Sequence, residues 1–255
     1  MKKHIASILF LFLLSTFQLI AQSHSVKRLG IEQGLSNNYV VSITQDKQGF
    51  LWFATEEGLN KFDGTRFTTY YKNDLTQDNQ GITGNELNRV YADTKHPIIW
   101  IATQRDGLNA YNYNEQTFTA YQHNPENPHS LITNDVTDIA PSTQHDDGLW
   151  ISTYYRGIEY LDITSGQFTH YNKNTVPGLP CEQTWTVLDG GDGNLYMGHV
   201  GSGFSILSLK DKSVKNFRNE AGNPMSLPGN DVFCIIKDTN GNIWLGTNKG
   251  LALYN

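Results

Sequence analysis

The sequence predicts an all-β fold, a β-propeller built of four-stranded antiparallel blades. A unit of about 48 residues is repeated five times along the chain. Each copy contains an aromatic residue, here called the anchor, which is followed by a small residue and then a glycine. The anchors are Trp52, Trp100, Trp150, Tyr196 and Trp244, so the spacings are 48, 50, 46 and 48 residues. A regular period of roughly 40 to 50 residues, with short strands, one aromatic and fixed glycines, is typical of propeller blades.

Each copy divides into four expected strands. An inner strand, rich in β-branched and aromatic residues, follows a turn of the Leu-Ser-x-Asn kind and is expected at 40–44, 87–92, 136–140, 184–188 and 232–237. An Asp-x-x-Gly turn, as at 46–49 and 238–241, then reverses the chain into the strand with the aromatic anchor. A second turn ends on a glycine and starts the third strand. Outer strands are expected at 67–70, 118–121, 168–171 and 214–217.

The repeats occupy residues 34–80, 81–129, 130–177, 178–225 and 226–255, and the last one stops after its third strand. Residues 25–29 stand where an outer strand is expected, so they could complete the fifth blade and close a five-bladed ring. Closure would remove exposed sheet edges. A fragment of a larger propeller is the alternative, because an array cut after any third strand gives the same count.

The amino end has a different composition. Residues 1–21 read as a signal peptide, since two lysines precede a mostly apolar stretch at 5–20 that is shorter than the roughly 20 residues of a spanning helix. An uncleaved membrane anchor is the alternative. Export would leave residues 22–255 as one periplasmic domain with no second membrane span. Loss of the two lysines takes the formal charge from −6 to −8, and with no basic stripe nucleic acid is excluded as a partner.

No catalytic set, metal site or cofactor is predicted. The eight histidines lack metal-ligand spacing, and Ser202 lies in Gly-Ser-Gly without the strand, sharp turn and helix of a nucleophile elbow. Cys181 and Cys234 are expected to be two small buried thiols. A disulfide is the alternative, because export brings them into an oxidising compartment.

One face of the propeller is expected to bind ligands. The turns between second and third strands emerge there, and their side chains differ from copy to copy while the framework does not. The candidate ligand-binding residues are Glu57, Arg105, Asp106, Tyr154, Tyr155, Arg156, His199 and Lys249. An arginine can bond a uronate or sulfate bidentately, and a tyrosine can stack on a sugar ring. Ordinary solvated turns are the alternative.

Residues 34–70, GLSNNYVVSITQDKQGFLWFATEEGLNKFDGTRFTTY, resemble the two-component regulator propeller repeat. The pattern of inner strand, Asp-x-x-Gly turn, Leu-Trp-x-x-Thr and Gly-Leu recurs in all five copies, with Tyr196 replacing tryptophan in the fourth. In that family the repeats form the periplasmic sensory part of hybrid histidine kinases of polysaccharide-degrading bacteria. Members generally have seven-bladed propellers, then an immunoglobulin-like domain, a membrane helix and the kinase.

The resemblance implies an input domain for signal transduction by phosphorelay, which senses an oligosaccharide or another small ligand and pairs as a homodimer as sensor kinases do. The chain carries no phosphoacceptor histidine motif and no Gly-x-x-x-x-Gly-Lys loop, so neither a kinase core nor enzyme activity is expected. Two alternatives stay open, because fold alone does not decide function. They are a propeller enzyme acting on glycans, such as a glycosidase or lyase, and a plain protein-interaction scaffold.

Overall fold

The computed structural model describes residues 26–73 and 81–254, and there it confirms the predicted fold class. Apart from one 3-10 turn, η1 (Ile31–Gln33), the regular structure of the described residues consists of antiparallel β-strands. The signal peptide expected at 1–21 lies outside the described residues.

The strands form five sheets, one for each repeat. Blade 1 contains β1 (Val40–Gln45), β2 (Leu51–Thr55), β3 (Gly58–Phe62) and β4 (Phe67–Tyr70). Blade 2 contains β5 (Leu87–Ala92), β6 (Ile98–Thr103), β7 (Leu108–Asn112) and β8 (Thr117–Tyr121). Blade 3 contains β9 (Val136–Pro141), β10 (Gly148–Thr153), β11 (Gly157–Asp162) and β12 (Gln167–Tyr171). Blade 4 contains β13 (Thr184–Asp189), β14 (Asn194–His199), β15 (Phe204–Ser208) and β16 (Val214–Phe217), and blade 5 contains β17 (Val232–Lys237), β18 (Ile243–Thr247) and β19 (Gly250–Tyr254).

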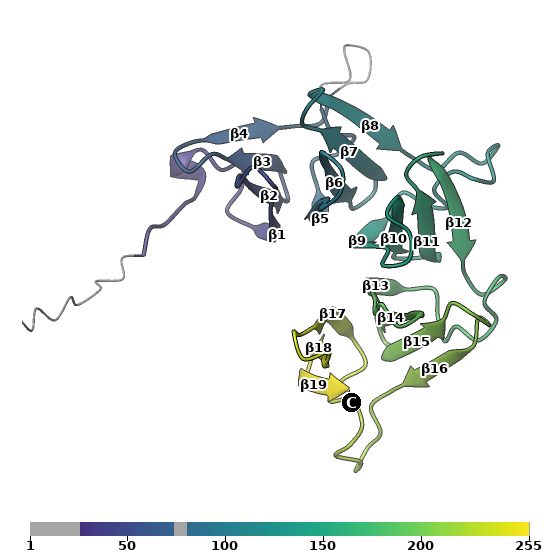
Figure 1. The fold of residues 1–255 in the computed structure, drawn as a ribbon. Coiled ribbons are helices and arrows are strands. Elements are labelled where there is room, and N and C mark those ends of the chain that lie inside the picture. Colours follow the sequence, from purple (N-terminus) through teal and green to yellow (C-terminus); the bar gives the residue numbers. More distant parts are fainter. Residues whose placement is uncertain (1–25, 74–80, 255) are drawn as a thin grey trace, which may run out of the picture.

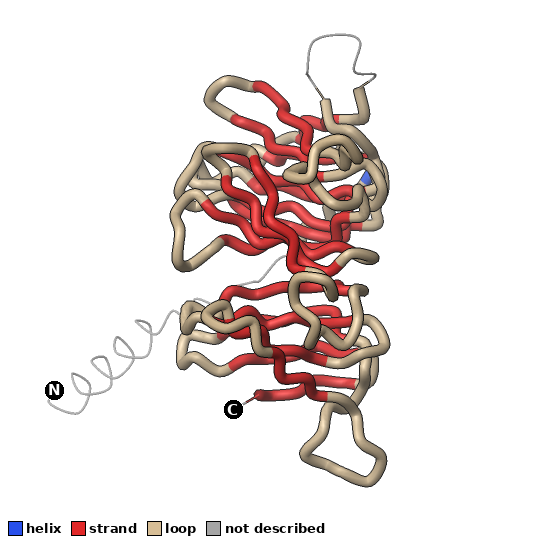
Figure 2. Tube along the Cα trace, turned by 90° about the vertical axis from the view of Figure 1, so that its right-hand side faces the viewer, coloured by secondary structure: helices blue, strands red, loops and turns tan. Residues whose placement is uncertain are grey.

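The blades follow one another around a common axis. Figure 1 shows the inner strands β1, β5, β9, β13 and β17 on the axial side and the outer strands at the periphery. Seen at a right angle to this view, the loops gather on two opposite faces of the body (Figure 2). The arrangement is that of a propeller, open between blade 1 and blade 5.

The expected closing strand is not formed. Residues 26–29 have no strand structure, and the sheet of blade 5 has three strands. Leu29 instead packs against the cluster of Leu35, Phe53 and Phe62 in blade 1. The sides of the two terminal blades that face the opening are consequently exposed, as Ile43 (59% exposed) and Leu251 (68%) show.

Four of the five repeated aromatics, Trp52, Trp100, Trp150 and Tyr196, pack between blades. Trp52 is fully buried and contacts Ile82, Leu87 and other apolar residues of blade 2. Its indole Nε1 donates to Oδ2 of Asp46 at 2.7 Å. The other carboxylate oxygen of Asp46 accepts from backbone N–H groups of the Asp-x-x-Gly turn, so one aspartate binds both the anchor and the turn. A buried indole N–H needs such a partner. In blades 1, 2 and 5 the aspartate and the anchor therefore form one structural unit.

The glycine that ends the second turn joins each blade to the next. Gly157 has φ +83°, and its N–H donates to the carbonyl oxygen of Glu182 in blade 4 at 2.9 Å. An added Cβ would lie 2.4 Å from the carbonyl oxygen of Tyr171, so a larger residue would collide with the backbone. The same N–H to O contact is made by Gly58, Gly107 and Gly203. The turns on this face are thus fixed at one end by a neighbouring blade.

Candidate ligand-binding site

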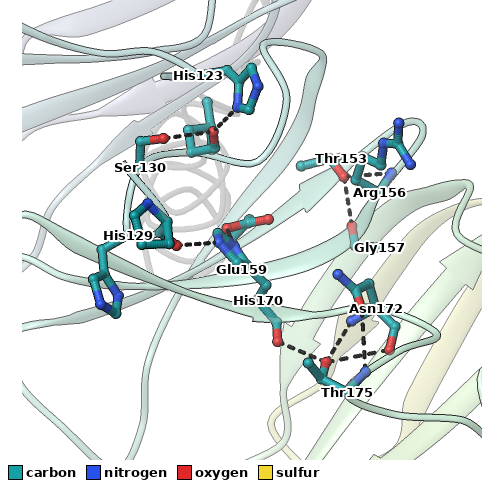
Figure 3. Close-up of polar contacts among 12 residues, drawn as sticks. His123, His129, Ser130, Thr153, Arg156, Gly157, Glu159, His170, Asn172 and Thr175 are labelled. Atoms are coloured by element: carbon teal, nitrogen blue, oxygen red, sulfur yellow. Dashed lines mark hydrogen bonds and ion pairs between the residues drawn. The ribbon is translucent and has the colours of Figure 1, made fainter. Parts of the chain in front are cut away.

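The turn between β10 and β11 carries the aromatic candidates in a fixed backbone. The N–H of Tyr154 donates to the carbonyl oxygen of Asp135 at 3.1 Å. The hydroxyl of Thr153 donates to the carbonyl oxygen of Gly157 at 2.9 Å and accepts from the N–H of Arg156 (Figure 3). Tyr154 and Tyr155 stand edge to face with ring centroids 4.6 Å apart. These rings are therefore presented by a turn that is already held at both ends.

Three of the predicted residues meet in one cavity, here called the mouth pocket. Its volume is about 210 Å³, and Arg105, Tyr154 and Tyr155 line it from neighbouring blades. The rest of the lining is Asn88, Gln104, Asp135, Thr137 and Trp185. The exposed guanidinium of Arg105 makes no hydrogen bond or ion pair within the described part of the chain. A guanidinium beside aromatic rings and amide groups suits a polar ligand with a ring face.

Two aromatic residues of the site were missed from the sequence. Trp185 lies at a centroid distance of 6.2 Å from Tyr154, and Phe233 lies 5.9 Å from Trp185, each pair edge to face. Both are the second residue of an inner strand, where the other copies have Val41, Asn88 and Thr137. The residue at this position varies between copies, as the turn residues do. This variation could have identified Trp185 and Phe233 as candidates from the sequence.

The remaining exposed candidates are not gathered at the mouth pocket. Arg156 is exposed but does not line it, and Asp106 pairs with Lys72 at 3.6 Å. Glu57 and Lys249 are exposed on blades 1 and 5, outside the pocket lining. The candidates thus fall into a group of three around one cavity and four separate positions on neighbouring turns.

The expectation that His199 lies on the ligand face is wrong. The side chain is fully buried, with Nε2 2.9 Å from Oγ of Ser205 and Nδ1 3.4 Å from Oγ1 of Thr184. Burial lowers the pKa of His199 to about 4, so the ring is neutral near pH 7. The position is occupied by threonine in the other four copies, as in Thr153, and this alignment marks it as framework.

Blade 3 also contains a buried carboxyl group that the sequence pattern does not predict. Glu159 is fully buried, and its Oε2 lies 2.6 Å from Nδ1 of His170, whose Nε2 lies 2.8 Å from the carbonyl oxygen of Pro128 (Figure 3). Its Oε1 has no hydrogen-bond partner. Desolvation raises the pKa of Glu159 to about 7, and the bond to Glu159 raises the pKa of His170. Neither residue lines the mouth pocket.

The cysteines and the metal-ligating residues add no further site. Both thiols are unpaired, and Cys234 is exposed rather than buried as expected, while Cys181 is half-buried. Within residues 26–73 and 81–254, no group of His, Cys, Asp and Glu has the arrangement of a metal site. Across the same ranges no helix has the length and apolar character needed to cross a bilayer.

Comparison with known proteins identifies the repeat. The family model described as two component regulator propeller matches residues 34–57 and 226–249, the starts of the first and last copies. These two segments are two-component regulator propeller repeats. A curated relative, histidine kinase P4 of Formosa agariphila, is 42% identical over 66 residues, which are 26% of this chain and 5% of that protein.

Solved structures extend this likeness to nearly the whole chain. The extracellular domain of the putative hybrid two component system BT3049 from B. thetaiotaomicron is 70% identical over 90% of this chain, with a TM-score of 0.84. That of BT4673 from the same organism is 23% identical with a TM-score of 0.71 and supports the fold alone. The chain covers 30% and 32% of these two solved chains.

Proposed function

We propose that this regulator propeller is the extracytoplasmic input part of a two-component system and binds an oligosaccharide at the mouth pocket. The observation that carries the proposal is the convergence of Arg105, Tyr154, Tyr155 and Trp185, from three blades, around one cavity. The likeness to extracellular domains of hybrid two-component systems supports the sensory role and the location outside the cytoplasm. The chain would act on a kinase in the same signalling system, paired as a homodimer.

Each side chain has a role that its geometry suits. The free guanidinium of Arg105 can form two parallel hydrogen bonds to a uronate or sulfate group, or single bonds to sugar hydroxyls. The exposed ring of Tyr155 and the half-buried rings of Tyr154 and Trp185 offer apolar faces to the C–H face of a sugar. The amides of Asn88 and Gln104 supply donors and acceptors for hydroxyl groups.

The pocket favours binding over turnover. Glycoside hydrolysis requires two carboxyl groups that flank the scissile bond, whereas Asp135 is the one carboxylate among the described residues that line this pocket. Asp135 is moreover engaged by the hydroxyl of Thr133 at 3.1 Å from Oδ2. The buried carboxyl of Glu159 lies outside the lining.

Calorimetry against a panel of uronate-containing and neutral oligosaccharides tests the proposal. Arg105→Ala should weaken binding of acidic members about ten- to hundredfold, the value of a charged hydrogen bond. Tyr155→Ala should weaken binding of both kinds. Arg156→Ala is the matched control, an arginine on the same face outside the pocket, and should leave affinity unchanged.

Two results would contradict the proposal. Affinity that is indifferent to both Arg105→Ala and Tyr155→Ala would place the site elsewhere. Release of shorter glycans, followed by chromatography of the same mixtures, would show an enzyme instead of a binding domain.

A further inference from the structure

A second cavity, here called the axial cavity, lies along the inner strands and adjoins the mouth pocket. Its volume is about 760 Å³, and all five inner strands contribute to its walls. The two cavities share Asn88, Gln104, Thr137 and Trp185. Because they share walls, one elongated ligand can extend from the mouth pocket into the axial cavity.

Arg89 of β5 is a cationic side chain in this cavity. Its Nε lies 3.0 Å from Oδ1 of Asp138 on β9, and about half of the side chain is exposed. Apart from this ion pair, the guanidinium has no hydrogen-bonding partner in the described part of the chain. The terminal amino groups are therefore available, and their fork geometry matches a carboxylate or sulfate.

Asp138 is itself held by the next blade. Its side chain is 11% exposed, and Oδ2 accepts from the hydroxyl of Thr186 at 2.6 Å and from the N–H of Val187 at 3.3 Å. These bonds fix the carboxylate, and the fixed carboxylate orients the Nε side of Arg89. A guanidinium with one edge engaged and the other open is positioned in advance for an incoming anion.

The other charges around the cavity limit what it can bind. Asp138 balances the charge of Arg89, and the exposed carboxylate of Glu56 lies on the rim. Net charge therefore does not attract a polyanion, and the favourable contact is local to one guanidinium. Trp185 and Phe233 supply an apolar part of the wall of the same cavity. This combination suits a saccharide with a single acidic group better than a densely charged chain.

We propose that the axial cavity is a second subsite for an acidic saccharide, where Arg89 receives a carboxylate or sulfate group while a sugar ring lies against Trp185 and Phe233. The inference rests on the proposed function, because the mouth pocket holds the rest of the same ligand.

Cys234 provides a reporter inside this cavity. It is exposed on β17, lines the axial cavity, and is close enough to Arg89 and Asp138 for both charges to act on its thiol. The sequence has two cysteines, so Cys181→Ser leaves Cys234 as the single thiol. Desolvation raises the pKa of the Cys234 thiol, and alkylation should therefore be followed at alkaline pH.

The experiment measures the alkylation rate of Cys234 in the Cys181→Ser chain with xylo-oligosaccharides of increasing length that each carry one glucuronate, and with neutral xylo-oligosaccharides of the same lengths. At about ten times the Kd, an acidic ligand in the cavity should slow alkylation about tenfold. Arg89→Gln should weaken acidic binding about ten- to hundredfold and remove the protection. Glu56→Gln should strengthen acidic binding, since it removes a rim carboxylate. Arg66→Gln, which alters an exposed arginine paired with Asp63, should change nothing.

The outcomes separate the two proposals. Binding that depends on Arg105 and Tyr155, with unprotected Cys234 and no effect of Arg89→Gln or Glu56→Gln, overturns the axial subsite and leaves the proposed function standing. Failure of every oligosaccharide to bind overturns both. If Arg89→Gln misfolds, the protection of Cys234 in the unaltered cavity and the effect of Glu56→Gln on acidic binding still test the axial subsite.

Discussion

Replacement of Glu159 by Gln should change how the stability of the propeller depends on pH. Glu159 is fully buried, and desolvation raises its pKa from 4.5 to about 7. The folded protein keeps a proton on this carboxyl that the unfolded chain releases above about pH 4.5. The stabilisation is therefore fully present below about pH 4.5 and is lost as the pH rises to about 7. The change amounts to about 3 kcal/mol in the free energy of unfolding.

The neighbouring histidine acts in the same direction. The pKa of His170 is raised by its hydrogen bond to Glu159, so its stabilising contribution is present below 6.5 and is lost as the pH rises through its folded pKa. His123, which follows β8, is the other ionisable group that acts on Glu159. Both groups thus bind their protons more tightly in the folded protein than in the unfolded chain.

Denaturant unfolding between about pH 5 and pH 8 measures this directly. The difference in unfolding free energy between the unaltered chain and Glu159→Gln should fall with rising pH, by up to about 3 kcal/mol. Asn109 occupies the equivalent position in blade 2, opposite Ala120 as Glu159 is opposite His170. Asn109→Gln is therefore the matched control and should give a difference independent of pH. A constant difference for Glu159→Gln as well would refute the reasoning.

Three further outcomes are expected from denaturant unfolding. Trp150→Ala should cost about 3 to 5 kcal/mol because the ring is 3% exposed, and Trp244→Ala should cost less because that ring is half-buried in the three-stranded sheet; equal costs would contradict the packing argument. Gly157→Ala should cost more than Gly64→Ala, since both have positive φ but only Gly157 would bring a Cβ against a carbonyl oxygen, and similar losses would show that strain alone matters. For His199→Asn, the difference in unfolding free energy from the unaltered chain should change with pH in the opposite direction to that for Glu159→Gln. Because the folded pKa of His199 is about 4, its stabilising contribution is present above pH 6.5 and is lost as the pH falls to about 4. A pH dependence of the same sign would mean that the ring is charged in its buried site.

The blades could be predicted from the sequence because each blade is a local object. The outer strands expected at 67–70 and 214–217 coincide with β4 and β16, and the inner strand expected at 136–140 is β9 with one residue added. Turn chemistry, alternation and the aromatic anchor all act within one repeat. The repeat alignment therefore carries nearly all the information that such a sheet requires.

The closing strand and the site depend on relations between blades. Residues 26–29 have the length of an outer strand, but the packing of Leu29 on blade 1 decides their course, and no local pattern reports that contact. Arg105 and Trp185 are 80 positions apart and meet because blades 2, 3 and 4 curve around one axis. The prediction for His199 was wrong for the opposite reason. The alignment of His199 with threonine in the other copies indicated a buried position, but the prediction was based on the neighbouring turn.

The mouth pocket lies across blades whose backbones are already tied together, and this bears on how a bound ligand could be sensed. Arg105 belongs to blade 2, Tyr154 to blade 3 and Trp185 to blade 4, while the N–H of Gly107 and the N–H of Gly157 each donate to the blade that follows. The turns need little ordering on association, so most of the contact energy remains as affinity. A ligand that touches three blades at once stabilises their relative arrangement in proportion to the logarithm of its concentration above the Kd. Ligand binding at such a site would therefore signal by favouring one relative arrangement of the blades. A partner protein that binds this arrangement more tightly than others would, in turn, raise the affinity of the propeller for the ligand.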